Sequence, residues 1–336
     1  MTQQRGSGAT PTISQVAAAA GVSKSTVSRA FSRPEMITAE TVAHVMDVAT
    51  RLGYVPNHTA RALSTGRAGT VAIVVPDIAN PFFPPLIRGA QAAADQAGFS
   101  LLLGDSDEDP TREDVLVGKF GPQTDGIVLA SSRMTEEQIR AHAERRPLVL
   151  INRDVPGLPR VLIDTATGIA AAVEHLAGLG HRHLVYVSGP TSSWSNAERR
   201  RAVRAAGRRL GLKVSAVAAR RSTYDAGVQR VDDILGSGAS AVIAFDDLLA
   251  QGILAGLAAR GVSVPDQFSV IGCDDVLAAT MSPPLTTVSA HGGHAGRKAV
   301  DLLVSFLDGN EGDQRRVLDT SLVLRSTTAP PAVRRN

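Results

Sequence analysis

The sequence has one cysteine, no long hydrophobic run and no secretion signal. Because Cys273 has no second cysteine to pair with, an intrachain disulfide framework and a multi-cysteine zinc site are both excluded. No apolar run reaches 18 residues, and the N-terminus lacks a basic segment followed by an apolar one. These absences favour a soluble, cytoplasmic protein that contacts no membrane. The chain has 336 residues, 43 % of them hydrophobic, so we expect two or three domains with sizeable cores.

Positive charge is concentrated at the N-terminus. Residues 1–67 contain seven Lys and Arg but only three Asp and Glu, which gives a net charge of +4. The other 269 residues carry a net charge of −1. A basic segment beside a near-neutral body is typical of a nucleic-acid-binding head attached to a domain with a separate task.

The basic head is predicted to contain three helices, after a flexible tail over residues 1–11. Thr12 and Gln15 can form a capping box at the start of the first helix, and Gly21 can end it. Ser23 can cap a second helix over 23–31, and a third helix is predicted over 38–52. The side chains expected on the inner faces of the second and third helices are Val27, Ala30, Phe31, Val42, Val45, Met46 and Ala49.

Two short helices joined by a glycine turn and followed by a third fit a helix-turn-helix. The side chains expected on the outer face of the second helix are Lys24, Ser25, Ser28 and Arg29. Short hydroxyls and two cations suit entry into the major groove, where they reach base edges or phosphates. The alternative interpretation is a small helical bundle with a solvated charged face.

The remainder of the chain alternates short aliphatic segments with amphipathic helical stretches. Continuous apolar strands of this kind predict parallel sheets buried on both faces, and their number predicts two doubly wound lobes. Ligands of such folds bind beyond the carboxyl ends of the strands, here between the lobes. Strands are expected at 71–75, 99–103, 127–129, 148–151, 184–187, 214–217, 241–244 and 270–271, with helices over 83–97 and near 112–120.

The head resembles the DNA-binding segment of the lactose-repressor (LacI/GalR) family. The matching blocks are Thr12-Ile-Ser-Gln-Val-Ala, Ala20-Gly-Val-Ser-Lys-Ser-Thr-Val-Ser-Arg29, Leu52-Gly-Tyr-Val-Pro-Asn57 and Ala60-Arg-Ala-Leu63. The resemblance implies DNA contacts from Thr12, Ser23, Lys24, Ser25, Thr26, Ser28, Arg29, Tyr54, Asn57, Ala60 and Leu63. It also implies that Lys24 and Ser25 read bases, and that Leu63 is wedged between base pairs from a hinge helix that orders on DNA. Two hinges meet only in a homodimer, so the target is expected to be a near-palindromic double-stranded operator.

The body resembles the same family along its whole length. The matching blocks are Val75-Pro-Asp-Ile-Ala-Asn-Pro-Phe-Phe83, Gly180-His-Arg-His-Leu184, Ser188-Gly-Pro190, Val270-Ile-Gly-Cys-Asp-Asp275 and Pro283-Pro-Leu-Thr-Thr-Val288. The implied fold is an all-α helix-turn-helix head on a two-lobed α/β body like a type I periplasmic binding protein. The implied divisions are a DNA-binding domain at 12–56, a hinge helix and linker at 57–68, an effector-binding and dimerisation domain at 69–330, and a tail at 331–336. Within that domain the N-lobe takes about 69–164 and 291–319, and the C-lobe takes about 165–290 and 320–330.

Seven residues are candidates for an effector pocket between the lobes: Phe82, Phe83, Asn152, Trp194, Arg199, Asp246 and Asp274. By resemblance, Arg199 and Asp274 bind effector; Asp246 stands where the family usually has asparagine, and Asn152 where aspartate is common. The alternative for Arg199 is a solvated helix face, that for the phenylalanines is core packing, and that for Trp194 is a loop anchor. Carboxylates, an amide, an arginine and aromatic faces suit a neutral polyhydroxylated ligand, a sugar or polyol.

Enzyme and metal chemistry find little support in the sequence. Asp246 and Asp274 are a possible carboxylate pair for a hydrolase, but no Gly-x-Ser-x-Gly elbow, Walker A motif or dinucleotide fingerprint is present. His181 and His183 belong to a family block, and His291 and His294 lack a clear third ligand, so we expect no metal and no cofactor. Cys273 has no obvious histidine base and is a poor candidate nucleophile.

The sequence therefore predicts a dimeric DNA-binding transcription regulator, a repressor of carbohydrate or polyol metabolism genes under control of a small effector. One alternative is a corepressor-type regulator that senses a purine or a phosphorylated metabolite. Another is a free-standing sugar-binding protein, although such proteins usually carry a secretion signal. A third is a nucleoid-type DNA-binding protein with a degenerate body; an intact pocket argues against it and a filled pocket supports it. No leucine heptads follow Arg325, which favours a dimer over a tetramer.

Overall fold

The computed structural model describes residues 11–32, 34–54, 68–310 and 314–332. The chain divides into two compact units, Met1–Ala68 and Gly69–Asn336. We call the first unit the head and the second the body. Within these described ranges, no helix is both long and apolar enough to span a lipid bilayer.

The head is a helical bundle whose ends are fixed by the caps that the sequence predicts. Its elements are α1 (Ile13–Ala20), α2 (Lys24–Ser32), the 3-10 turn η1 (Pro34–Met36) and α3 (Ala39–Leu52). At the start of α1, the Thr12 backbone N–H donates to Gln15 Oε1 at 2.7 Å, and the Gln15 N–H donates to Thr12 Oγ1 at 3.4 Å. Gly21 ends α1 in the left-handed region at φ 66°, so the chain turns sharply before α2. The predicted capping box and glycine turn are both confirmed.

The core of the head forms where the apolar faces of the three long helices meet. Val16, Val27 and Val45 are fully buried at its centre. The prediction that Met46 faces inward is wrong, because its side chain is 41 % exposed while Val48 is 4 % exposed. Val45 and Val48 are three residues apart and share one face of α3, whereas Met46 is turned about 100° away from Val45.

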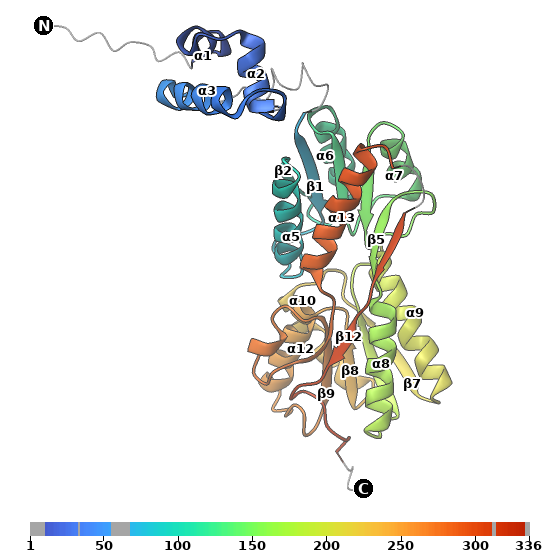
Figure 1. Ribbon diagram of the computed structural model, residues 1–336. Helices are drawn as coiled ribbons and strands as arrows, with labels where there is room; N and C mark the ends of the chain where they lie inside the picture. Colours follow the sequence, from blue (N-terminus) through green and yellow to red (C-terminus); the bar gives the residue numbers. More distant parts are fainter. Residues whose placement is uncertain (1–10, 33, 55–67, 311–313, 333–336) are drawn as a thin grey trace, which may run out of the picture. The chain divides into compact units, whose positions relative to one another are not determined.

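The body contains two sheets of six strands, which define the two lobes (Figure 1). In the N-lobe the strand order is β11-β5-β4-β3-β1-β2, and every pairing is parallel. The N-lobe elements are β1 (Thr70–Val75), α5 (Phe83–Gln96), β2 (Ser100–Asp105), α6 (Pro110–Phe120), η2 (Gly121–Gln123), β3 (Gly126–Ala130), α7 (Glu136–Ala143), β4 (Leu148–Ile151), β5 (Arg160–Ile163), α13 (Gly292–Leu307) and β11 (Arg315–Leu318).

The C-lobe repeats this plan with one reversed strand. Its order is β12-β10-β9-β8-β6-β7, and only β12 is antiparallel to its neighbour. The C-lobe elements are α8 (Thr165–Gly178), β6 (His183–Ser188), α9 (Trp194–Arg209), β7 (Lys213–Ala218), α10 (Tyr224–Gln229), α11 (Val231–Gly236), β8 (Ala241–Ala244), α12 (Asp247–Ala259), β9 (Ser269–Asp274), η3 (Ala278–Thr280), β10 (Thr286–Ser289) and β12 (Ser321–Val323).

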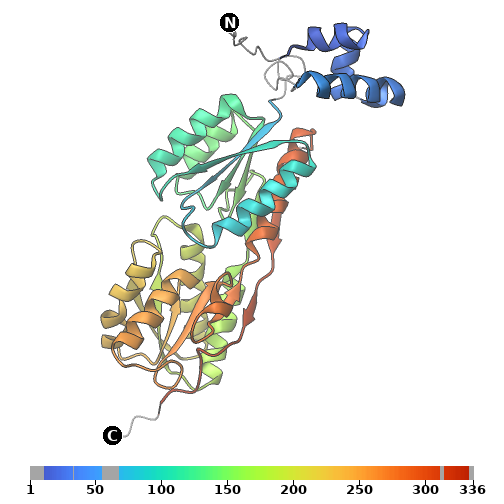
Figure 2. The ribbon, with the colours of Figure 1, turned by 90° about the vertical axis from the view of Figure 1, so that its left-hand side faces the viewer.

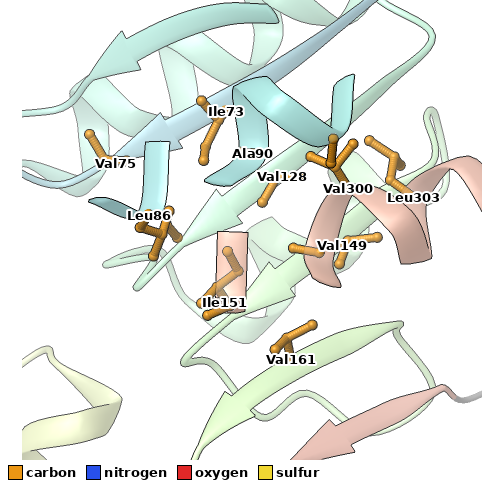
Figure 3. Close-up of a cluster of buried hydrophobic side chains, with 14 of the residues drawn as sticks. Ile73, Val75, Leu86, Ala90, Val128, Val149, Ile151, Val161, Val300 and Leu303 are labelled. Atoms are coloured by element: carbon orange, nitrogen blue, oxygen red, sulfur yellow. The ribbon is translucent and has the colours of Figure 1, made fainter. Parts of the chain in front are cut away.

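Helices cover both faces of each sheet, which explains why the central strands are continuously apolar. In the N-lobe, α5 and α13 lie side by side on one face (Figure 2). Figure 3 shows the core beneath them, where Ile73, Val128 and Val149 of neighbouring strands meet Leu86 of α5 and Val300 of α13. A second apolar cluster fills the opposite face under α6 and α7. The predicted doubly wound architecture is confirmed.

The chain crosses between the lobes three times, from β5 to α8, from β10 to α13 and from β11 to β12. The first and third crossings touch, because Thr320 Oγ1 donates to the Asp164 carbonyl at 2.7 Å. Four strands were not predicted from the sequence: β5, β10, β11 and β12. In β10 the reason is composition, since Thr286 and Thr287 are polar yet fully buried and the Thr287 hydroxyl donates to Asp247 Oδ1 at 2.6 Å.

Candidate functional site

The outer face of α2 gathers hydroxyls and cations, as the sequence predicts. Lys24, Ser25, Ser28 and Arg29 are all exposed and lie on one face of the helix. The first turn of α2 contains no acidic residue. Such a face offers a DNA major groove two positive charges and two short hydrogen-bonding groups.

A cluster of hydroxyls surrounds the start of α2. The Thr26 backbone N–H donates to Ser23 Oγ at 3.1 Å, and Ser23 Oγ also lies 2.7 Å from Ser25 Oγ and 2.8 Å from Thr26 Oγ1. Hydroxyls and free N–H groups at a helix start suit a phosphate oxygen. Thr12 is the N-cap residue at the exposed start of α1 and offers a hydroxyl in the same way.

Tyr54 is held by the core of the head, and the rest of the predicted hinge lies outside the described residues. The Tyr54 ring packs edge-to-face against Phe31, with 5.6 Å between the ring centroids. The remaining predicted DNA contacts, Asn57, Ala60 and Leu63, fall in the segment that the structure does not describe.

In the body, polar side chains from both lobes converge on one cavity, which we call the cleft. It lies beyond the carboxyl ends of the strands, where ligands of doubly wound folds bind. Six of the seven predicted effector residues line it; Trp194 does not. The cleft residues are Asn80, Phe82, Phe83, Glu108, Ser131, Arg133, Asn152, Ser193, Ser195, Arg199, Ser222, Phe245, Asp246 and Asp274.

Asp246 is a hydrogen-bonding centre of the cleft. It caps α12, where its Oδ1 accepts the Leu249 backbone N–H at 2.9 Å. Its Oδ2 accepts from the Ser222 hydroxyl and, across the cleft, from Asn80 Nδ2 at 3.0 Å. One carboxylate therefore anchors a helix with one oxygen and joins the two lobes with the other.

Arg199 is buried, not solvated, which decides between the two interpretations of its position. Its guanidinium donates to Thr165 Oγ1 at 3.1 Å, to the Phe245 carbonyl and to Asp274 Oδ1 at 3.3 Å. It also lies over the Phe245 ring, 4.8 Å from the centroid. Although burial lowers the pKa of Arg199, the acidic groups around it raise that pKa above its ordinary value, so the guanidinium stays charged.

Asp274 faces Arg199 in the same buried environment. Burial raises the pKa of its carboxyl well above the ordinary value; Arg199 opposes this shift, and the carboxylates of Asp246 and Asp247 add to it. A carboxyl under this pressure is stabilised by any further hydrogen-bond donor, such as a ligand hydroxyl. Two carboxylates from the C-lobe thus meet one arginine at the cleft.

The N-lobe contributes a second ion pair that the sequence interpretation missed. Arg133 donates to both carboxylate oxygens of Glu108, at 2.5 and 2.9 Å, and to the Ser131 carbonyl at 2.8 Å. Both residues follow parallel strands by a few positions, Glu108 after β2 and Arg133 after β3. The rule that ligand-binding residues follow the carboxyl ends of parallel strands predicts both positions.

Residues with a strained backbone are concentrated around the cleft. Among the described cleft residues, Glu108, Ser131, Asn152 and Asp274 have φ values of 62°, 51°, 51° and 124°. Residues other than glycine rarely adopt such positive φ values, and a cluster of such residues is typical of ligand sites. Asn152 is held there by the Ile163 backbone N–H, which donates to its Oδ1 at 3.0 Å.

The cleft is narrow in this structure. Its volume is about 30 Å³, room for about two water molecules. Across the cleft, the lobes are joined by the Asn80–Asp246 hydrogen bond and by an exposed ion pair of 2.5 Å between Arg221 and Asp107. A sugar therefore enters only when the lobes separate or these side chains move.

Phe82 and Phe83 are 7 % and 5 % exposed and pack edge-to-face, with centroids 5.1 Å apart. Both line the cleft and both belong to the N-lobe core, so the predicted stacking and packing roles are compatible at this position. Trp194 lies instead on a second cavity of about 420 Å³ near the lobe crossings.

Two residues considered for metal binding or nucleophilic catalysis, His181 and Cys273, are buried in the C-lobe. His181 hydrogen-bonds Ser240 Oγ at 2.7 Å and the Ala329 carbonyl at 3.0 Å. Cys273 is fully buried in the C-lobe core, and burial raises the pKa of its thiol well above the ordinary value. In the described part of the chain, no three His, Cys, Asp or Glu side chains come together in a way that could hold a metal ion.

A helix-turn-helix head with a basic outer face, joined to a two-lobed body with a polar cleft, defines the class of DNA-binding regulators built on a binding-protein fold. Comparison with known proteins agrees. Residues 12–57 match the family model described as bacterial regulatory proteins, lacI family, and residues 173–328 match a periplasmic binding protein-like domain. The HTH-type transcriptional regulator DegA of Bacillus subtilis (strain 168) is 34 % identical over 334 residues, covering 95 % of this chain and 98 % of DegA. The chain belongs to the LacI family of DNA-binding transcription regulators.

Solved structures show the same architecture. The Lac repressor dimer bound to operator and the anti-inducer ONPF superposes with a TM-score of 0.87 over 96 % of this chain and all of that chain, at 24 % identity. The complex of the transcriptional regulator CelR with cellobiose gives a TM-score of 0.70 at 31 % identity, covering 94 % of this chain and 99 % of CelR.

Proposed function

We propose that this regulator is a homodimeric repressor that binds a near-palindromic operator and is controlled by a neutral sugar or polyol in the cleft. In this proposal residues 12–56 bind DNA and 57–68 form the hinge and linker. Residues 69–330 bind effector and form the dimer, in the lobes predicted from the sequence, and 1–11 and 331–336 are tails. The protein acts in the cytoplasm, on the nucleoid.

The observation that carries the proposal is the composition of the cleft. Three carboxylates, two arginines and three phenylalanine rings from two lobes line one small volume. Carboxylates accept hydrogen bonds from adjacent hydroxyls, and rings cover the C–H face of a sugar. With three acids against two arginines, the lining disfavours an anion. The cellobiose complex of CelR supports the same chemical class.

The proposed mechanism is a change in the balance between two lobe arrangements. An effector hydroxyl takes the place of the Asn80 amide at Asp246 Oδ2, and a second one donates to Asp274. The cleft contact that closes the lobes is then replaced by contacts to the ligand. The ligand shifts the equilibrium only as far as it binds one arrangement more tightly than the other, and operator affinity changes with it.

A thermal-shift screen of the purified chain tests the effector class. The panel holds pentoses, hexoses, disaccharides, polyols, sugar phosphates and purines. Stabilisation by one neutral sugar or polyol, lost in Asp246→Asn, is the expected result. Stabilisation by phosphorylated or purine ligands alone would instead favour the corepressor alternative, with Arg199 and Arg133 as the anion-binding groups.

A second candidate function is favoured by the small size of the cleft. A body that binds no effector, in a nucleoid-type DNA-binding protein, accounts for a cavity of about 30 Å³. If the protein is of this kind, no compound of the thermal-shift panel stabilises it, and it binds many unrelated DNA sequences with similar affinity. Selection of binding sites from random DNA separates the two candidates, because a repressor enriches one near-palindrome.

A further inference from the structure

A second cavity of the body is separate from the cleft and is lined in part by Trp194, the one tryptophan of the sequence. It has a volume of about 420 Å³, within the range of small-molecule sites. It lies where the chain passes from the N-lobe to the C-lobe. Its lining residues are Asp154, Leu162, Ile163, Asp164, Thr165, Ala166, Trp194, Glu198, Arg201, Arg315 and Val317.

We propose that this second cavity binds a neutral sugar of one or two rings, with the Trp194 ring as its stacking surface. Trp194 is half-buried at the start of α9, and within the described chain its indole N–H makes no hydrogen bond. A half-exposed indole combines a flat apolar face with a free donor. Val317, which is 43 % exposed, adds apolar surface from β11.

Two of the three acids around the second cavity are paired with arginines and the third, Asp164, is hydrogen-bonded at the start of α8, so a neutral ligand fits better than an anion. Asp154 accepts hydrogen bonds from Arg160 and from Arg315, the latter at 3.4 Å. Glu198 accepts from Arg201 at 2.5 Å. Asp164 caps α8, where it accepts the Thr167 N–H at 3.1 Å and the Thr167 hydroxyl at 2.7 Å.

These groups still have unused hydrogen-bonding capacity. Each carboxylate has about four lone-pair sites, and each guanidinium has five N–H donors. A sugar therefore finds both acceptors and donors around the ring of Trp194.

Residues of one helix, α9, line both cavities, so we expect ligand binding in one cavity to affect binding in the other. Along α9, Ser195 and Arg199 line the cleft, whereas Trp194, Glu198 and Arg201 line the second cavity. Thr165 lines the second cavity and accepts the Arg199 Nε hydrogen at 3.1 Å. Because a ligand there contacts both lobes and their crossing, it changes the affinity of the cleft for its own ligand, and the cleft ligand changes its affinity by the same factor.

Nuclear magnetic resonance tests this directly, because a chain with one tryptophan gives one indole N–H signal. The full-length protein is titrated with D-ribose, D-glucose and cellobiose. The variants are Asp246→Asn, which impairs the cleft; Val317→Phe, which places a ring in the second cavity; and Val115→Phe, a control at a site 49 % exposed on α6.

The expected result is that at least one sugar shifts the indole signal in the wild type, in Asp246→Asn and in Val115→Phe. Val317→Phe loses the shift while its spectrum stays that of a folded protein. The proposal is overturned if Asp246→Asn abolishes the shift, because Trp194 then only reports binding in the cleft. It is equally overturned if Val317→Phe keeps the shift or if none of the three sugars moves the signal. A shift that survives in a protein whose cleft binds nothing would support this site and contradict the cleft as effector site, so the two proposals fail separately.

Discussion

At the scale of single residues, the chemistry of the body depends on buried carboxylates that share few cations. Asp246 is 2 % exposed and makes three hydrogen bonds, one of them to the other lobe. Asp247, next in the chain, is 4 % exposed and accepts hydrogen bonds from Thr287 Oγ1 at 2.6 Å and from the Val276 N–H at 3.2 Å. The two neighbours have different tasks, and each gives a prediction.

For the effector, Asp246→Asn is expected to weaken binding. The amide replaces one of the two acceptor oxygens, and a hydrogen bond to a charged group contributes about 1.5–3 kcal/mol, or roughly 10- to 150-fold in Kd. Calorimetry with the sugar identified by thermal shift measures the loss. Asp232→Asn is the matched control, because Asp232 is an exposed partner of Arg260 far from the cleft residues. Equal affinity in wild type and Asp246→Asn would place the effector elsewhere.

The raised pKa of Asp247 predicts that the stability of the folded protein depends on pH. Burial raises the pKa of its carboxyl from 3.8 to about 6, Thr287 opposes the shift, and Asp246 adds to it. The folded state therefore holds the proton more tightly than the unfolded state, so this group's contribution to stability is present in acid and is lost as pH rises from about 4 to about 6. Asp247→Asn removes that loss, since an amide donates to the Thr287 hydroxyl and accepts from Val276.

The variant and the wild type are compared at each pH, because burial lowers the pKa of half-buried His175 and of buried His181, which gives the opposite trend in both proteins. Relative to the wild type, Asp247→Asn is expected to gain about 3 kcal/mol between pH 4 and pH 7, about 1.4 kcal/mol for each pKa unit. Urea unfolding followed by Trp194 fluorescence measures it. A constant difference across this range would contradict the assignment; the exposed Asp301→Asn is the control.

The resemblance and the residues together predicted six of the residues that line the cleft, and the structure explains what they missed. Asp246, Asp274 and Arg199 stand in motifs with recognisable spacing. Glu108 and Arg133 stand in the loops after β2 and after β3, and no sequence motif marks either position. Trp194 is adjacent to Ser195 in sequence, but neighbouring side chains on a helix point in different directions, so proximity to a pocket residue did not predict its own location.

At the scale of elements, the N-lobe depends on two helices that approach closely through glycines. A Cβ built on Gly296 of α13 would lie 1.9 Å from the Leu86 carbonyl oxygen, and one on Gly89 of α5 would lie 1.9 Å from the Gly293 carbonyl oxygen. The backbone of one helix therefore occupies the space that a side chain on the other would need. This packing fixes the start of α5, which positions Phe82 and Phe83 at the cleft.

Gly296→Ala is expected to destabilise the protein. The methyl group has to displace backbone, and overpacking of this kind costs about 1–3 kcal/mol or more. Gly118→Ala in α6 is the matched control, because nothing lies within 4 Å of its added Cβ and alanine favours helix over glycine by about 0.5–1 kcal/mol. Thermal unfolding should thus shift in opposite directions for the two variants. A similar change in both would show that helix contact is not the cause.

In the head, a substitution on the outer face of α2 is expected to change the DNA sequence that the protein prefers. Lys24→Ala is expected to alter the bases selected at one operator position, because a good base contact discriminates by about 1–3 kcal/mol. Binding-site selection from random DNA, followed by anisotropy titration, measures it. Arg51→Ala is the control, since Arg51 is exposed on α3 and paired with Asp47. If Lys24→Ala weakens every sequence equally, Lys24 contacts phosphate and not a base.

Elements whose pattern is local were predictable, and elements defined by their neighbours were not. The caps of α1 and the apolar central strands were read from a few adjacent residues. Strand β11 has exposed residues at three of its four positions and exists because it pairs with β5 across more than 150 residues of chain. Such pairing leaves no periodic signal in a single segment.

At the scale of the whole molecule, the account depends on one coupling: a ligand between the lobes changes the affinity of the head for DNA. The three crossings between the lobes and the hydrogen bond from Thr320 to Asp164 are where that change of lobe arrangement must be absorbed. In the proposed mechanism, the narrow cleft with Asn80 bonded to Asp246 is one of the two arrangements. Family membership establishes the class of regulator.

The most direct test measures operator affinity with and without the sugar that gives the largest thermal shift. Fluorescence anisotropy with the selected operator is recorded for the wild type and for Asp246→Asn. We expect the sugar to change wild-type operator affinity by about 5- to 150-fold, the usual range of such couplings, and to leave the operator affinity of Asp246→Asn unchanged. We also expect operator to change sugar affinity by the same factor. A sugar that binds the wild type while operator affinity stays constant would contradict the central claim.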